Sequence, residues 1–71
     1  MTPRKGRVRN KIHALRTARG LSQAALADMV GATRQTINAI EQEKYAPSLE
    51  LAFRIAQAFE LAFEKVWSFE D

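Results

Sequence analysis

The chain has 71 residues, no cysteine and one histidine, which excludes disulfides and a thiolate metal site and leaves helix packing and oligomerisation to stabilise so small a core. Residues 1–45 contain nine Lys or Arg and three acidic residues, a net charge of +6, whereas residues 46–71 contain two basic and five acidic residues, a net charge of −3. The first part of the chain can therefore attract a polyanion. No apolar run reaches the roughly 20 residues of a membrane span and none follows the basic start, so we expect a soluble, cytoplasmic protein that needs no metal or cofactor.

The predicted elements begin after a basic arm, residues 1–9, which precedes one folded domain at residues 10–71. Within that domain apolar side chains recur every three or four residues, which is the period of an α-helix. Turn-forming residues divide the pattern into an all-α bundle of five short helices, at residues 10–19, 23–30, 33–42, 49–59 and 63–66. Residues 6–9 and 67–69 alternate polar and apolar side chains instead, which allows them to pair as a short terminal β-ribbon.

Hydroxyl and glycine residues mark the helix boundaries. Ser22, Thr33 and Ser48 each stand at the start of a predicted helix, where a side-chain oxygen can accept a hydrogen bond from a free backbone N–H. Gly20 and Gly31 follow the first two helices, where a left-handed residue commonly ends a helix. The second and third helices are therefore separated by a tight turn at Gly31.

The two helices joined by this turn are the most informative part of the chain. Ala27 lies where the helices must approach closely, so a small side chain is needed there. Ile37 and Ile40 are expected to anchor the second helix of the pair on the bundle. The opposite face of that helix is then free, and its polar N-terminal residues could enter a DNA major groove, which is about 12 Å wide.

This stretch resembles the phage repressor/Cro type of helix-turn-helix, also called the xenobiotic-response-element family of bacterial transcriptional regulators. The resemblance spans about residues 8–69 and is carried by many spaced matches: Leu15-Arg16, Gly20-Leu21-Ser22-Gln23, Leu26-Ala27, Gly31, Arg34-Gln35-Thr36-Ile37, Ile40-Glu41, Lys44-Tyr45 and Pro47-Ser48-Leu49. Within the family the chain looks like the short members that consist of the DNA-binding bundle alone. The resemblance therefore implies a regulator that binds double-stranded DNA.

The resemblance also assigns roles to individual positions. Side chains of the third helix would contact base edges, because Arg pairs with guanine and Gln or Asn with adenine: Arg34, Gln35, Asn38 and Thr36. Helix starts and the loop after the third helix would hold the DNA backbone, through Ser22, Gln23, Thr33, Lys44 and Tyr45. Packing within the loop is the alternative role for Lys44 and Tyr45. Arg16 and Glu41 match a buried ion pair that ties the first helix to the third.

Two positions depart from the family pattern. Glu43 stands after the third helix where the family commonly has glycine, and a non-glycine residue in a left-handed cap costs on the order of 1 kcal/mol. The carboxylate of Glu43 would also lie close to the DNA backbone. Glu60 and Ala62 replace the glycine and hydroxyl cap that often precede the last helix, so the boundary between the fourth and fifth helices is less well marked.

Large apolar side chains are concentrated near the C-terminus, more than a bundle of this size is expected to bury. We expect five of them to form the interface of a two-fold homodimer: Leu61, Phe63, Val66, Trp67 and Phe69. Packing in the core is the alternative role for Phe63, Trp67 and Phe69. Two copies would bind half-sites roughly 34 Å apart. Such a dimer would act as a repressor by covering promoter DNA, although activation through contact with polymerase fits the sequence as well.

Other classes of protein fit the sequence less well. An enzyme is not expected, because no nucleophile lies near a suitable base and no glycine loop could cradle a phosphate. A protein-binding module, such as an antitoxin with the same fold, is the stronger alternative, since the apolar C-terminal segment could bind a foreign protein. A peripheral membrane peptide ranks last. The basic residues between Arg4 and Arg9 could either enter a DNA groove or pair as a strand.

Overall fold

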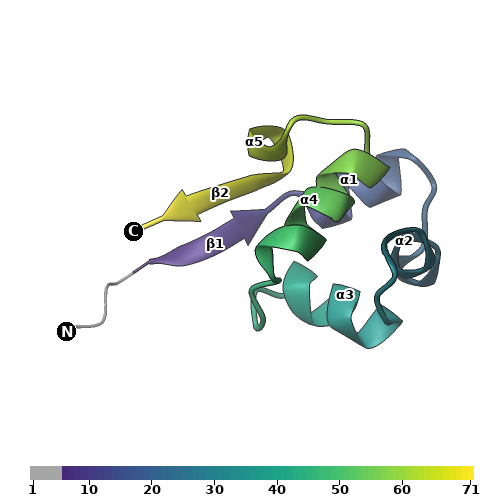
Figure 1. Ribbon diagram of the computed structural model, residues 1–71, viewed down its shortest axis with the longest axis horizontal. Coiled ribbons are helices and arrows are strands. Elements are labelled where there is room, and N and C mark those ends of the chain that lie inside the picture. Colours follow the sequence, from purple (N-terminus) through teal and green to yellow (C-terminus); the bar gives the residue numbers. More distant parts are fainter. Residues whose placement is uncertain (1–5) are drawn as a thin grey trace.

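The computed structural model describes residues 6–71 and has a helical bundle with a two-stranded ribbon at one side (Figure 1). In chain order the elements are β1 (Arg7–Asn10), α1 (Ile12–Ala18), α2 (Gln23–Val30), α3 (Arg34–Glu41), α4 (Leu49–Ala58), α5 (Phe63–Val66) and β2 (Trp67–Glu70). The expected all-α bundle of five helices with a terminal ribbon is thereby confirmed for the described residues. Residues 1–5 of the expected basic arm lie outside them.

Three hydroxyl side chains cap the helices that they precede. The Ser22 hydroxyl accepts a hydrogen bond from the Ala25 N–H at 3.0 Å, which satisfies a backbone donor at the start of α2. Thr33 does the same for α3 at 3.1 Å and Ser48 for α4 at 3.1 Å. Each such cap stabilises a helix by about 1 kcal/mol. The caps fix where α2 and α3 begin and therefore the geometry of the turn between them.

Left-handed residues follow four of the helices, the first being Gly20 after α1 with φ of 66°. Gly31 follows α2 with φ of 72°, as the turn requires. Glu43 and Glu60 adopt the same conformation after α3 and α4, with φ of 61° and 57°. Each lies in a Schellman motif, in which the N–H groups of two successive residues bond back to carbonyls of the last helical turn. Two glutamates thus occupy backbone positions that favour glycine.

The core is formed by one side of every helix together with the first residue of β2. Its members are almost fully buried: Ile12, Leu26, Ala27, Val30, Ile37, Ile40, Ala52, Ile55, Ala56, Phe59, Val66 and Trp67. The indole N–H of Trp67 donates to the Ala52 carbonyl at 3.0 Å, so the polar atom of this side chain is also satisfied. Val66 and Trp67, both expected at a dimer interface, are instead buried in the core of the single chain, so that expectation is corrected for these two residues.

The ribbon is antiparallel, with Arg7 opposite Glu70 and Asn10 opposite Trp67. Side chains alternate between its two faces, so Val8 and Asn10 share the face that turns toward the bundle while Arg7 and Arg9 lie on the other. Residues 7–9 therefore belong to the folded domain and not to an arm that precedes it. Asn10, expected in the first helix, is the last residue of β1, and its side-chain oxygen accepts a hydrogen bond from the Ile12 N–H at 3.1 Å.

Candidate nucleic-acid interface

The exposed face of α3 carries three of the four residues expected to contact bases. Ile37 and Ile40 are buried on its inner side, which leaves Arg34, Gln35 and Asn38 exposed to solvent. These three side chains line one surface hollow of about 190 Å³. Within the described part of the chain, neither Arg34 nor Gln35 forms a side-chain hydrogen bond or an ion pair, so both have free donors. An arginine and a glutamine free in this way can form bidentate contacts with base edges.

Asn38 is held by neighbouring amide side chains. Its side-chain oxygen accepts hydrogen bonds from Gln23 at 3.2 Å and from Gln42 at 3.3 Å. The Gln23 amide also donates to Glu41 at 3.4 Å, which connects the start of α2 to α3. This network restricts the rotamers of Gln23 and Asn38 before any ligand binds. Asn38, expected to contact a base, and Gln23, expected to contact the DNA backbone, are therefore parts of one polar surface.

Thr33, Thr36 and Tyr45 form the other edge of the same surface. Together with Gln35 and Ala39 they line a second hollow of about 280 Å³ beside α3. The hydroxyls of Thr33 and Thr36 are 2.9 Å apart and share a hydrogen bond. Tyr45 is half exposed and lies beside α3. Its ring can therefore pack within the loop while its hydroxyl remains accessible. Lys44 is exposed beside it.

Arg16 and Glu41 form the ion pair that the resemblance implies, and it ties α1 to α3. Two hydrogen bonds of 2.8 and 3.0 Å join the guanidinium to the carboxylate, and Arg16 also donates to the Leu21 carbonyl. Both side chains are largely buried, at 13% and 7% exposure. Burial acts to raise the pKa of Glu41, but the hydrogen bonds and charge of Arg16, with contacts from Gln23 and His13, hold this pKa below its ordinary value. The pair therefore ties α1 to α3, and its hydrogen bonds occupy the Arg16 guanidinium.

A second charged cluster joins the ribbon to the loop after α3. The Arg9 guanidinium binds the Glu43 carboxylate at 2.6 Å and Glu70 at 2.9 Å, and Arg7 approaches Glu43 at 3.5 Å. The hydrogen bond and charge of Glu43, followed by the charge of Glu70, raise the pKa of Arg9 above its ordinary value. Sequence reasoning missed this cluster. The signal was present in the alternating pattern of Arg7 and Arg9 in a possible strand and in a glutamate at a glycine position.

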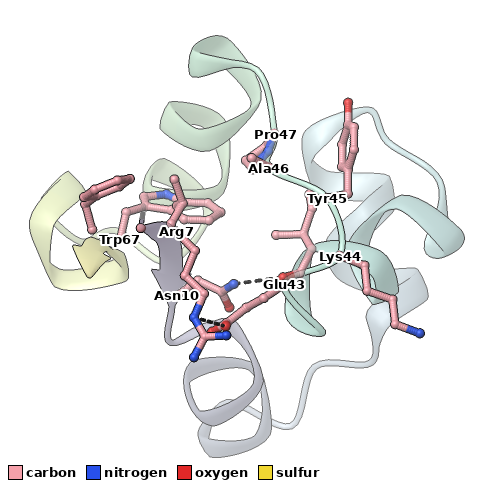
Figure 2. Close-up of a pocket in the computed structure, with 12 residues that line it drawn as sticks. Arg7, Asn10, Glu43, Lys44, Tyr45, Ala46, Pro47 and Trp67 are labelled. Carbon is pink, nitrogen blue, oxygen red and sulfur yellow. Dashed lines mark hydrogen bonds and ion pairs between the residues drawn. The ribbon is translucent and has the colours of Figure 1, made fainter. Parts of the chain in front are cut away.

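A surface hollow of about 320 Å³ lies between the ribbon and this loop. Figure 2 shows Arg7 and Glu43 reaching toward each other across one side of it, while Lys44 and Tyr45 point away from the Glu43 carboxylate. The lining of the hollow therefore includes both the charged contact with β1 and the two side chains expected to hold DNA, Lys44 and Tyr45.

Large apolar side chains are exposed beside α4 and the ribbon. Leu49 is 67% exposed, Phe69 62% and Phe53 47%. Phe53 packs on Phe63 with ring centroids 4.7 Å apart, and Val8 lies opposite Phe69 in the ribbon. We refer to these five residues as the apolar patch. Of the residues expected at a dimer interface, Phe63 and Phe69 lie in this patch, and Leu61 is half-buried against the core.

Residues 6–71 contain neither a metal-binding cluster nor a membrane-spanning helix. No group of three His, Asp or Glu side chains in that range is placed to hold a metal ion. No helix in the same range is long and apolar enough to cross a membrane.

Taken together, a capped helix pair with a tight left-handed turn and a free polar face on its second helix defines a helix-turn-helix protein of the Cro/C1 type. The profile of the helix-turn-helix family matches residues 12–66, and the chain belongs to this family. The α3 helix is the recognition helix of this motif.

Relatives of similar length support the assignment. An HTH-type transcriptional regulator of Methanocaldococcus jannaschii is 45% identical over 64 residues, which cover 90% of this chain and 97% of that protein. The HTH-type transcriptional regulator YgzD of Bacillus subtilis is 45% identical over the same lengths. Both are described as uncharacterized. A crystal structure of a Bacteroides fragilis protein, described as a candidate DNA-binding protein, matches with a TM-score of 0.76 at 20% identity and covers 86% of this chain and 98% of its own, which shows the shared fold.

Proposed function

We propose that this protein is a sequence-specific DNA-binding transcriptional repressor that binds a two-fold-symmetric operator as a homodimer. The observation that carries the proposal is the free polar face of α3, where Arg34, Gln35 and Asn38 surround one hollow above a buried isoleucine anchor. Arg34 and Gln35 have no competing partner in the described chain, so their hydrogen-bonding groups are available to bases. The names of the relatives as transcriptional regulators support the same conclusion.

The surroundings of α3 suit a phosphate backbone on both sides. Ser22 and Gln23 stand at the start of α2, where free backbone N–H groups and the helix dipole favour an anion. On the other side Thr33, Lys44 and Tyr45 provide hydroxyl and ammonium donors that are exposed or adjacent to the exposed face. We assign these five residues to the DNA backbone, which fixes the register in which α3 meets the bases.

The apolar patch supports dimerisation. One recognition helix reads only a few base pairs, so a second copy is needed for a specific operator. The patch exposes Leu49, Phe53 and Phe69, and aromatic and aliphatic groups of this kind form the centres of protein interfaces. We therefore place the dimer axis beside the patch, with Phe63 and Leu61 at its margin. A dimer bound across a promoter would repress by excluding polymerase.

Selection of binding sites from random duplex DNA tests the DNA-binding proposal. Wild-type protein should enrich a two-fold-symmetric site, and Arg34→Ala and Gln35→Ala should each relax the readout at particular positions at a cost of about 1–3 kcal/mol. Lys65→Ala is the matched control, because it removes an exposed charge from α5, away from α3. Binding that is only salt-sensitive and non-specific for the wild type would refute sequence-specific recognition.

Sedimentation or light scattering at micromolar concentration tests the dimer. Leu49→Lys should raise the dimer dissociation constant by about 30-fold or more, because it places a charge in the patch at its most exposed residue. Met29→Lys is its control, since Met29 is a similarly exposed apolar residue of α2 outside the patch. A monomeric wild type would overturn the dimer. A stoichiometric foreign protein that binds wild type but not Leu49→Lys would favour the antitoxin-like alternative.

A further inference from the structure

The end of the recognition helix is an unusual place for an acidic residue. Glu43 follows α3 in the left-handed conformation, its N–H donates to the Ile40 carbonyl at 2.9 Å, and the N–H of Lys44 donates to the Ala39 carbonyl at 3.0 Å. The carboxylate is therefore one residue from Lys44 and two from Tyr45, both assigned to phosphates above. An unpaired negative charge at this position would repel the DNA phosphates. A mobile Glu43 side chain would also leave the loop less well fixed.

The ribbon removes both disadvantages. Arg9 binds the Glu43 carboxylate at 2.6 Å, and the Glu43 side chain is only 20% exposed. On the same strand, the Asn10 side chain donates to the Ile40 carbonyl at 2.9 Å, the carbonyl that the Glu43 N–H also contacts. Two neighbouring residues of β1 thus hold the last turn of α3 and the residue that follows it. Figure 2 shows the Glu43 side chain turned toward β1 and away from Lys44 and Tyr45.

We propose that Arg9 is a positioning residue for DNA binding that acts through Glu43: it neutralises this carboxylate and draws it toward the ribbon, so that the loop presents Lys44 and Tyr45 to the phosphates. The inference rests on the proposed function, but it concerns a residue outside the helix-turn-helix. Glu70 holds the other side of the Arg9 guanidinium at 2.9 Å and so fixes its orientation. In this arrangement the β-ribbon supports the DNA-binding surface without contacting DNA.

The competing role for Arg9 is a direct contact with phosphate, and a double-mutant cycle separates the two. If Arg9 acts through Glu43, Arg9→Ala should weaken binding to the selected operator by about tenfold in the wild-type background. In the Glu43→Gly background the same change should alter affinity by less than about twofold, because glycine removes the carboxylate and adopts the left-handed conformation freely. A direct phosphate contact would give equal losses in both backgrounds and a smaller salt dependence.

The matched control is Lys11→Ala, which removes an exposed positive charge two residues from Arg9 that forms no ion pair within residues 6–71. Thermal unfolding of every variant separates lost folding from lost binding. Amide NMR shifts provide a readout without DNA, and Lys44 and Tyr45 should shift in Arg9→Ala but not in Lys11→Ala. Unchanged loop shifts, or equal losses in the two backgrounds while Lys11→Ala binds normally, would overturn the positioning role alone. Absence of specific binding by the wild type would instead refute the proposed function, and this inference with it.

Discussion

Removal of the Glu41 carboxylate should strongly destabilise the protein, because it breaks the largely buried ion pair with Arg16. Glu41→Ala takes the bidentate carboxylate from the Arg16 guanidinium, which is 13% exposed, and leaves it the Leu21 carbonyl and the His13 ring as neighbours. Breaking a buried ion pair from one side costs about 3–5 kcal/mol. Because the truncation also admits water, we expect the lower value, about 3 kcal/mol, against a total of roughly 4–10 kcal/mol for a chain of this length.

Thermal unfolding followed by circular dichroism measures this cost. For a domain of this size each kcal/mol lowers Tm by about 4–8 °C, so Glu41→Ala should lower Tm by about 12–24 °C. The double variant Arg16→Met with Glu41→Leu should be within about 1 kcal/mol of wild type, since apolar residues of similar volume replace both charges. A Tm loss below about 4 °C for Glu41→Ala, or a double variant as unstable as the single one, would refute the assignment of this pair as a buried positioning contact.

Three further outcomes are expected from unfolding measurements. The pKa of Glu41 is lower in the folded chain than its unfolded value of about 4.5, so the unfolded chain binds more protons between the two values. The stability that this group contributes is therefore complete above about pH 4.5 and is lost as the pH falls through the folded pKa. The Arg16→Met/Glu41→Leu variant should lack this loss of stability in an acid titration. Trp67→Phe should cost about 1–3 kcal/mol, because it leaves the buried Ala52 carbonyl without its donor and opens a small cavity; a cost near zero in chemical denaturation would contradict this. Glu60→Gly should stabilise the chain by about 0.5–1 kcal/mol, since Glu60 holds a left-handed φ, and a lower Tm would show that the side chain has a stabilising contact.

The elements that the sequence predicted well are those determined by local chemistry. Ser22, Thr33 and Ser48 cap helices because a hydroxyl at such a position satisfies a backbone N–H whatever the tertiary packing. Gly31 marks the turn because its φ of 72° is costly for other residues. The left-handed Glu43 was anticipated only through the family pattern, since nothing local distinguishes it from a helical glutamate.

The features that the sequence left undetermined depend on contacts between distant segments. Trp67 and Phe69 are both aromatic residues of β2, yet Trp67 is buried and Phe69 is 62% exposed. The reason is that only the end of the ribbon where Asn10 pairs with Trp67 lies against the bundle. Leu49 follows the apolar pattern of α4 but lies on its open side. The Arg9–Glu43 contact joins residues 34 positions apart, so periodicity within either segment could not reveal it.

The ribbon holds the end of the recognition helix, and its own contacts join residues that are far apart in the sequence. Arg9 and Glu70 are 61 residues apart, whereas the contacts within each helix are local. Contacts of this separation form late in folding, and exposed two-stranded pairs open without global unfolding. Since Asn10 and Arg9 hold the last turn of α3, amide protons at that end should exchange with solvent when the ribbon opens, while those near Ile37 exchange only when the bundle does. One helix would then contain two regions of different kinetic stability, with the boundary inside the surface proposed to bind DNA.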